Sequence, residues 1–162
     1  MNQESVYIET SIVSYLAARQ SRDLIASACQ QITWEFWDHC RTRYELYTSE
    51  LVVEESSAGN KEAVEQRLNF LRGIRELPID EEVKKLAAAL LAEGGVPLKA
   101  ELDALHIAIA TVNGMNYLLT WNCRHLDNPV TKPRIREICR MHGYTCPEIC
   151  TPLELAEAQS DE

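Results

Sequence analysis

The chain lacks any long apolar run, and this absence argues against a membrane-spanning helix. Of its 162 residues 46% are apolar, but no stretch approaches the roughly 20 consecutive apolar residues that a bilayer requires. The opening MNQESVYIET also lacks a basic segment followed by an apolar one, so we expect no signal peptide and a cytoplasmic location. The length fits a single domain over residues 1–162, with an acidic tail at 155–162.

Basic residues are scarce as well. The chain has 16 Lys and Arg against 25 Asp and Glu, a net charge of −9, which argues against a protein that coats nucleic acid through many phosphate contacts. A nuclease is not excluded, because a divalent cation can neutralise clustered active-site acids. Some basic side chains could hold an RNA backbone, although each could equally lie on a solvated helix face. These are Arg19, Arg22, Lys132 and Arg134.

Two common ligand-binding motifs are missing. The pair Gly94-Gly95 lacks the flanking residues of a phosphate-binding loop. The tightest group of soft metal ligands lacks the paired C-x2-C knuckle of common zinc sites: Cys139, His142, Cys146 and Cys150. We therefore expect the cysteines to be buried or idle thiols in a reducing compartment.

Apolar strand patterns alternate with helical ones along the chain. Short apolar runs predict strands at residues 5–9, 44–48, 76–79, 116–121 and 148–150. The longest helical pattern covers residues 22–43, with Leu24, Ala28, Ile32 and Phe36 predicted to face inward. Thr10 or Ser11 is expected to cap the first helix. The alternation predicts an α/β fold with a mainly parallel sheet.

Oxygen-bearing side chains stand where predicted strands end or helices begin. Glu9 follows an apolar strand, Asn122 follows another, and Asp103 lies in the first turn of a helix. Glu55 shares a helix face with Leu51, which favours it over Glu54 as an inward-facing acid. In open parallel sheets, ligands bind beyond the carboxyl ends of the strands. Because oxygen ligands suit hard cations, the pattern is typical of a site for a divalent ion.

Each of these residues also has an ordinary structural explanation. Glu9 can be a solvated turn residue, and Asp103 can be a helix-start residue or the buried partner of a base. His106 could bind a metal but is more typical of a core histidine. Trp34 and Trp37, which could stack on bases, more often build a core or a dimer face.

Four segments, in this order and spacing, resemble PIN-domain proteins: VYIETS, SELVVEESSAG, LDALHIAIA and YLLTWN. Within that family the chain is most similar to the VapC-type toxin ribonucleases of type II toxin–antitoxin systems. The resemblance extends over nearly the whole chain. It implies a three-layer α/β/α fold and endonucleolytic cleavage of RNA that depends on Mg²⁺ or Mn²⁺. It also implies a 5′-phosphate and a 3′-hydroxyl product, a cognate antitoxin and a homodimer.

The resemblance places the family's four catalytic and metal-binding positions on Glu9, Glu55, Asp103 and Asn122. Supporting roles fall on Thr10, Ser11, Thr120 and Glu54. Two positions depart from the family pattern: Glu9 is one methylene longer than the usual Asp, and Asn122 replaces an acid.

Fewer ligand charges weaken metal binding. The alternative to an active ribonuclease is therefore a catalytically weak or inactive PIN-fold module that binds RNA or protein. A third hypothesis, a phosphoacceptor domain, needs a lysine beyond a late strand, where Lys132 is the nearest candidate.

Overall fold

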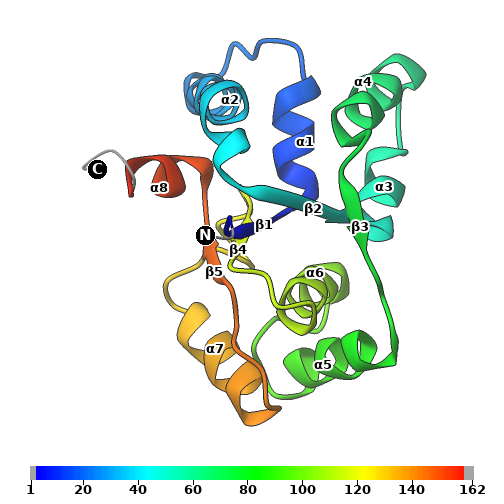
Figure 1. The fold of residues 1–162 in the computed structure, drawn as a ribbon, viewed down its shortest axis with the longest axis vertical. Helices are drawn as coiled ribbons and strands as arrows, with labels where there is room; N and C mark the ends of the chain where they lie inside the picture. The colour runs from blue at the N-terminus through cyan, green and yellow to red at the C-terminus, as the bar shows by residue number, and fades with distance from the viewer. Residues whose placement is uncertain (1–2, 159–162) are drawn as a thin grey trace.

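A five-stranded sheet forms the middle of the molecule (Figure 1). The computed structural model describes residues 3–158. The strands are β1 (Ser5–Ile8), β2 (Glu45–Ser49), β3 (Arg75–Leu77), β4 (Tyr117–Leu119) and β5 (Glu148–Cys150). They lie in the order β3-β2-β1-β4-β5, and each neighbouring pair is parallel. The predicted α/β class is confirmed, and the sheet is parallel throughout.

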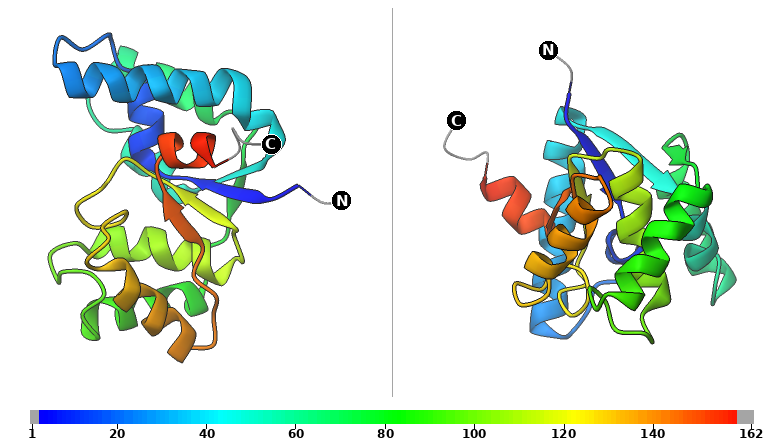
Figure 2. Two further views of the ribbon diagram at one scale, coloured as in Figure 1. Left: turned by 90° about the vertical axis from the view of Figure 1, so that its left-hand side faces the viewer. Right: turned by 90° about the horizontal axis from the view of Figure 1, so that it is seen from below.

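Helices cover both faces of the sheet and complete three layers, as Figures 1 and 2 show. One layer holds α1 (Thr10–Ala17), α2 (Leu24–Glu35), α3 (Glu50–Ser56), α4 (Lys61–Leu71) and α8 (Pro152–Glu157). The other holds α5 (Glu81–Ala92), α6 (Glu101–Val112) and α7 (Lys132–Met141). Within residues 3–158 no helix is long and apolar enough to cross a membrane. Residues 159–162 of the predicted acidic tail lie outside the described part of the chain.

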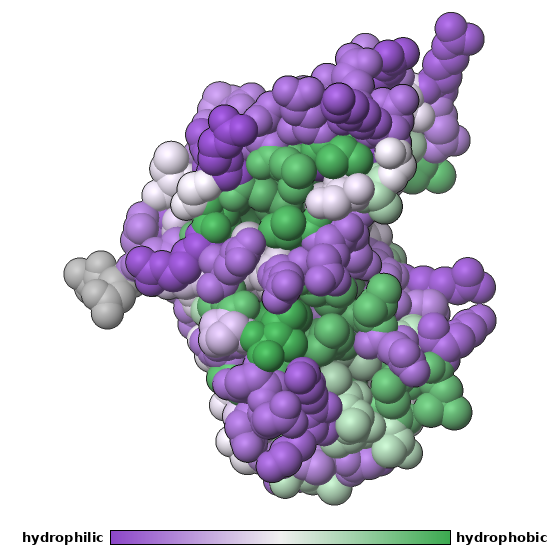
Figure 3. Space-filling model, turned by 90° about the vertical axis from the view of Figure 1, so that its right-hand side faces the viewer, coloured by the Kyte–Doolittle hydropathy of each residue, from purple (hydrophilic) through white to green (hydrophobic). Residues whose placement is uncertain are grey.

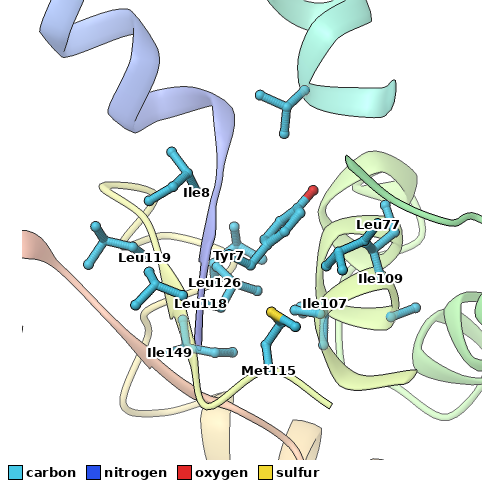
Figure 4. Close-up of a cluster of buried hydrophobic side chains, with 14 of the residues drawn as sticks. Tyr7, Ile8, Leu77, Ile107, Ile109, Met115, Leu118, Leu119, Leu126 and Ile149 are labelled. Carbon is cyan, nitrogen blue, oxygen red and sulfur yellow. The ribbon is translucent and has the colours of Figure 1, made fainter. Parts of the chain in front are cut away.

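The central strands are buried because helices pack on both sides of the sheet. Val6, Tyr7 and Ile8 of β1 and Leu118 and Leu119 of β4 have no exposed surface. In Figure 4, Tyr7 and Ile8 lie on opposite sides of β1, so the strand contributes to the core of both layers. This packing fixes the strand ends, which carry the residues of interest.

The long helix predicted over residues 22–43 is three shorter elements. Helix α2 is followed by a π-helical turn at Phe36–Cys40 and a 3-10 turn at Arg41–Arg43. The predicted inward face was wrong at its start, where Leu24 is 84% exposed, and right at its end, where Phe36 is buried. Gln30 is buried instead, with its side-chain amide bonded to the chain between α1 and α2. Specific hydrogen bonds, rather than apolar periodicity, therefore orient this helix.

The two tryptophans near this helix pack inward. Trp37 is buried and its ring meets Phe70 edge to face at 5.8 Å. Trp34 is half-buried and donates its indole N–H to the backbone oxygen of Leu16 at 3.2 Å. Their packing supports the core interpretation over a dimer face.

The order of the strands reverses between β1 and β4. After β1 the chain adds β2 and β3 on one side, then returns to place β4 and β5 on the other side. Ligands of open parallel sheets bind in the crevice outside the carboxyl ends at such a reversal. The residues that follow β1 and β4 are therefore the best placed for function.

Candidate active site

Glu9 and Thr120 directly follow the two strands at the reversal. The backbone N–H of Glu9 donates to Leu119 at 3.2 Å, and that of Thr120 to Cys150 at 3.0 Å, so the strand pairing continues to both residues. Their side chains meet, because the Thr120 hydroxyl donates to Glu9 Oε1 at 2.9 Å. Both are buried, with exposed fractions of 5% for Glu9 and 0% for Thr120.

Glu9 is the N-cap of α1. Its Oε2 accepts the backbone N–H of Ser11 at 2.6 Å. The predicted cap, Thr10 or Ser11, was wrong by one or two residues because glutamate is an uncommon N-cap beside serine, threonine and aspartate. The Ser11 hydroxyl instead accepts the backbone N–H of Trp121 at 2.8 Å. The hydroxyl thereby ties the start of α1 to the chain beyond β4.

Glu55 reaches the start of α1 from α3, whereas the neighbouring Glu54 is exposed. Its Oε1 accepts the Thr10 hydroxyl at 2.7 Å and lies 2.6 Å from His106 Nε2. Burial acts to raise the pKa of Glu55, but the bonds and charge from His106 and the bond from Thr10 outweigh it and lower the pKa. Glu55 is therefore a carboxylate held in place by two donors.

Asp103 lies in the first turn of α6, where the positive end of the helix dipole favours a carboxylate. Its Oδ1 accepts the side-chain amide of Asn122 at 3.2 Å, and its Oδ2 lies 2.9 Å from His125 Nδ1. The Asn122 oxygen accepts the backbone N–H groups of Arg124 at 3.2 Å and His125 at 3.0 Å. Asn122 thus turns its nitrogen, and not its oxygen, towards Asp103.

Thr120 joins the two halves of this arrangement. Besides donating to Glu9, its hydroxyl accepts the backbone N–H of Asn122 at 2.9 Å. Hydrogen bonds, together with the peptide link between Glu9 and Thr10, therefore connect six residues in one chain: Glu55, Thr10, Glu9, Thr120, Asn122 and Asp103. Residues from both sides of the sheet reversal are thus joined in one polar cluster, which we call the pocket.

The carboxylates have the right chemistry for Mg²⁺ or Mn²⁺, which prefer oxygen ligands. The groups that donate hydrogen bonds to these carboxylates are hydroxyls, a backbone N–H, a carboxamide and two histidines. Within residues 3–158 no three His, Cys, Asp or Glu side chains are grouped closely enough to hold an ion by themselves. Mg²⁺ often binds through one or two carboxylates together with water and substrate phosphates. The pocket fits an ion held in that way.

Two candidate functional residues, His125 and Tyr7, were not predicted from the sequence. His125 contacts Asp103 from a turn in which it lies three residues after Asn122. Tyr7 belongs to an apolar strand pattern, yet its hydroxyl lies 2.8 Å from His106 Nδ1. The sequence carries a signal for His125, a histidine close to a candidate ligand, but none for Tyr7, whose partners come from distant segments.

The predicted RNA-binding residues differ in their surroundings. Arg19 and Arg22 are exposed between α1 and α2. Arg134 donates to the backbone oxygen of Glu93 at 3.0–3.1 Å. Lys132 pairs with Asp127 at 2.6 Å; burial acts to lower the pKa of Lys132, but this partner raises it. Much of the positive charge at Lys132 is therefore already balanced within the protein.

Comparison with known families agrees with this architecture. The sequence profile described as PIN domain matches residues 6–126, from β1 to just beyond His125. The matched region contains the candidate carboxylates and their hydrogen-bond partners. A comparison with curated proteins returned no match. Since the profile covers most of the chain, the protein belongs to the PIN domain family.

Proposed function

We propose that this protein is a metal-dependent endoribonuclease that cleaves the phosphodiester bonds of RNA. PIN domains are generally nucleases that use divalent ions. The observation that carries the proposal is the convergence of Glu9, Glu55 and Asp103, from three separate elements, beside the sheet reversal. An acidic pocket at this place suits a reaction in which a cation and a phosphate are held together.

The carboxylates would hold Mg²⁺ or Mn²⁺ together with water and the phosphates of the substrate. When bound, the ion would supply positive charge to the scissile phosphate and lower the pKa of a water molecule. The protein's own groups orient the carboxylates: Thr120 holds Glu9, and Asn122 holds Asp103. Asn122 is thus assigned to positioning Asp103 by donating a hydrogen bond. The products would be a 5′-phosphate and a 3′-hydroxyl.

Arg19 and Arg22 are the basic residues that we propose to contact the RNA backbone. They follow α1, whose first residue adjoins Glu9 and whose eight residues span about 12 Å. Replacing both with alanine should weaken RNA binding and reduce the slope of log affinity against log salt by about 0.7 for each RNA phosphate that the arginines neutralise. Arg134→Ala is the control, because that side chain is bonded to Glu93. An equal change of slope in the control would refute the assignment.

Cleavage of structured RNAs in Mn²⁺ tests the activity, with Asp103→Asn as the critical variant. Glu101→Gln is the matched control, since Glu101 is an exposed acid in the same helical turn. We expect Asp103→Asn to lose more than the roughly 10–100-fold typical of residues that only orient a ligand. We expect Glu101→Gln to stay active. Equal cleavage by wild type and Asp103→Asn would place any activity elsewhere.

The sequence resemblance further supports a role as the toxin of a toxin–antitoxin pair, acting as a homodimer. A protein partner would find exposed apolar side chains at Leu24, Ile25, Leu98, Leu102 and Val130. Figure 3 shows apolar patches between polar bands on one face of the molecule. Light scattering with and without the product of an adjacent small gene tests both assignments. A monomer that forms no complex with it would refute them.

A further inference from the structure

A chain of hydrogen bonds runs from the core to Glu55. The Tyr7 hydroxyl lies 2.8 Å from Ser49 Oγ and 2.8 Å from His106 Nδ1. His106 Nε2 lies 2.6 Å from Glu55 Oε1, which also accepts the Thr10 hydroxyl at 2.7 Å. The chain joins β1, the end of β2, α6, α3 and α1. It links the pocket to five separate elements of the fold.

The available protons determine the direction of these bonds. The Glu55 carboxylate is an acceptor, so His106 must present a proton on Nε2. In the neutral imidazole Nδ1 is then the acceptor, and the Tyr7 hydroxyl donates to it. Ser49 accepts the backbone N–H of Val52 and has its own hydroxyl proton left for the Tyr7 oxygen. Every donor in the chain is used in this arrangement.

Glu55 needs such donors because of its place in α3. It is the penultimate residue of that helix, where the negative end of the dipole disfavours a carboxylate. Its side chain is 29% exposed, so without inward donors it could rotate into solvent. The imidazole of His106 is only 2% exposed and is fixed on its other side by Tyr7. His106 therefore holds the Glu55 side chain in one orientation, which the side chain would not keep by itself.

We propose that His106 is a positioning residue that holds Glu55 Oε1 and thereby turns Oε2 towards the ion-binding pocket. Tyr7 and Ser49 act indirectly: they stabilise the tautomer of His106 that carries its proton on Nε2. The inference rests on the proposed function, since it takes Glu55 as a ligand of the ion. Residues that orient metal ligands through a histidine–carboxylate bond commonly influence metal affinity.

Calorimetric titration of the full chain with Mn²⁺ tests the positioning role. We expect His106→Leu to weaken binding about 10–100-fold. His106→Gln should lose less affinity, because its amide can donate from nearly the position of Nε2. His142→Leu is the matched control. His142 and Glu93 are also 2.6 Å apart, but they lie at the C-terminal ends of α7 and α5 and belong to no part of the pocket. We expect that variant to bind Mn²⁺ as the wild type does.

A second measurement starts from the wild type, whose result does not depend on the folding of a variant. Two-bond ¹⁵N–¹H correlation spectra of the metal-free wild type report which imidazole nitrogen carries the proton. We expect Nε2–H for His106, and a loss of this single tautomer in Tyr7→Phe. A proton on Nδ1 alone, or wild-type Mn²⁺ affinity in His106→Leu, overturns the positioning role and leaves the proposed function intact. A wild type that fails to bind Mn²⁺ overturns both.

Discussion

Thr120→Val removes the hydroxyl that joins the two halves of the pocket and keeps the volume of the side chain. The hydroxyl donates to Glu9 Oε1 at 2.9 Å and accepts the backbone N–H of Asn122 at 2.9 Å. Thr120 is wholly buried, so water cannot easily take its place. The substitution therefore tests hydrogen bonding with little change in packing.

The cost can be estimated from the two bonds. A hydrogen bond to a charged group contributes about 1.5–3 kcal/mol. The N–H of half-buried Asn122 can be partly hydrated, so its loss adds little to the free energy of unfolding. We expect Thr120→Val to destabilise the protein by about 2–3 kcal/mol, and 1 kcal/mol lowers the Tm of a chain of this size by about 2–4 °C. The Tm should therefore fall by roughly 4–12 °C.

Thermal and urea unfolding measure this change, with Thr120→Ser as the control. Serine keeps the hydroxyl and loses one buried methyl group, which costs on the order of 1 kcal/mol. We therefore expect the order of stability wild type, then Thr120→Ser, then Thr120→Val, and the same order for Mn²⁺ affinity. A valine variant at least as stable as the serine variant would refute the reasoning, because packing would then outweigh the hydroxyl.

Three further changes probe charge and packing. Burial, and the hydrogen bond that its protonated carboxyl group donates to Glu154, raise the pKa of Asp127 to about 6, so the stability it contributes is present at low pH and is lost as the pH rises through about 6. Urea titrations should show a flatter pH dependence in Asp127→Asn, and an unchanged slope would contradict this. Asn122→Asp should lower the stability of the metal-free protein, because it places a carboxylate against Asp103, and should tighten Mn²⁺ binding. A variant in which stability and Mn²⁺ affinity both rise, or both fall, would contradict this prediction. A Cβ at Gly95 would lie 2.9 Å from the terminal carbon of buried Ile138 and 3.3 Å from the backbone oxygen of Leu90, which cannot rotate away, so Gly95→Ala should cost about 1–3 kcal/mol in urea unfolding, and a neutral effect would disprove the clash.

The fold class could be predicted because its signals are local. The apolar runs at β1 and β4 and the intervening helical periods determine alternating elements, and alternation favours a parallel sheet. The course of the chain after Asp23 could not be predicted in the same way. The apolar Leu24 suggested a buried face, but the contacts of Gln30 with the preceding loop turn the helix differently. Such contacts depend on tertiary structure and leave no periodic pattern.

The candidate site was predictable to the extent that parallel strands bring their carboxyl ends together. Glu9 and Asn122 follow β1 and β4, so their proximity follows from the sheet order. The roles of their functional groups were not predictable. Which end of the Asn122 amide faces Asp103 depends on the backbone N–H groups of Arg124 and His125, and these are placed by the turn.

The orientation of the Asn122 amide explains what replacing the family's acid at this position does to the pocket. An acid at this position would face Asp103 Oδ1, where the amide nitrogen now lies at 3.2 Å, and two carboxylates so close repel each other unless a cation lies between them. The amide replaces that repulsion with a hydrogen bond, so the metal-free pocket is easier to maintain. The same change removes one negative charge, which weakens attraction for the ion. Glu9, Glu55 and Asp103 keep their charge among donors that are mostly neutral, and this remaining charge is what a divalent cation would balance.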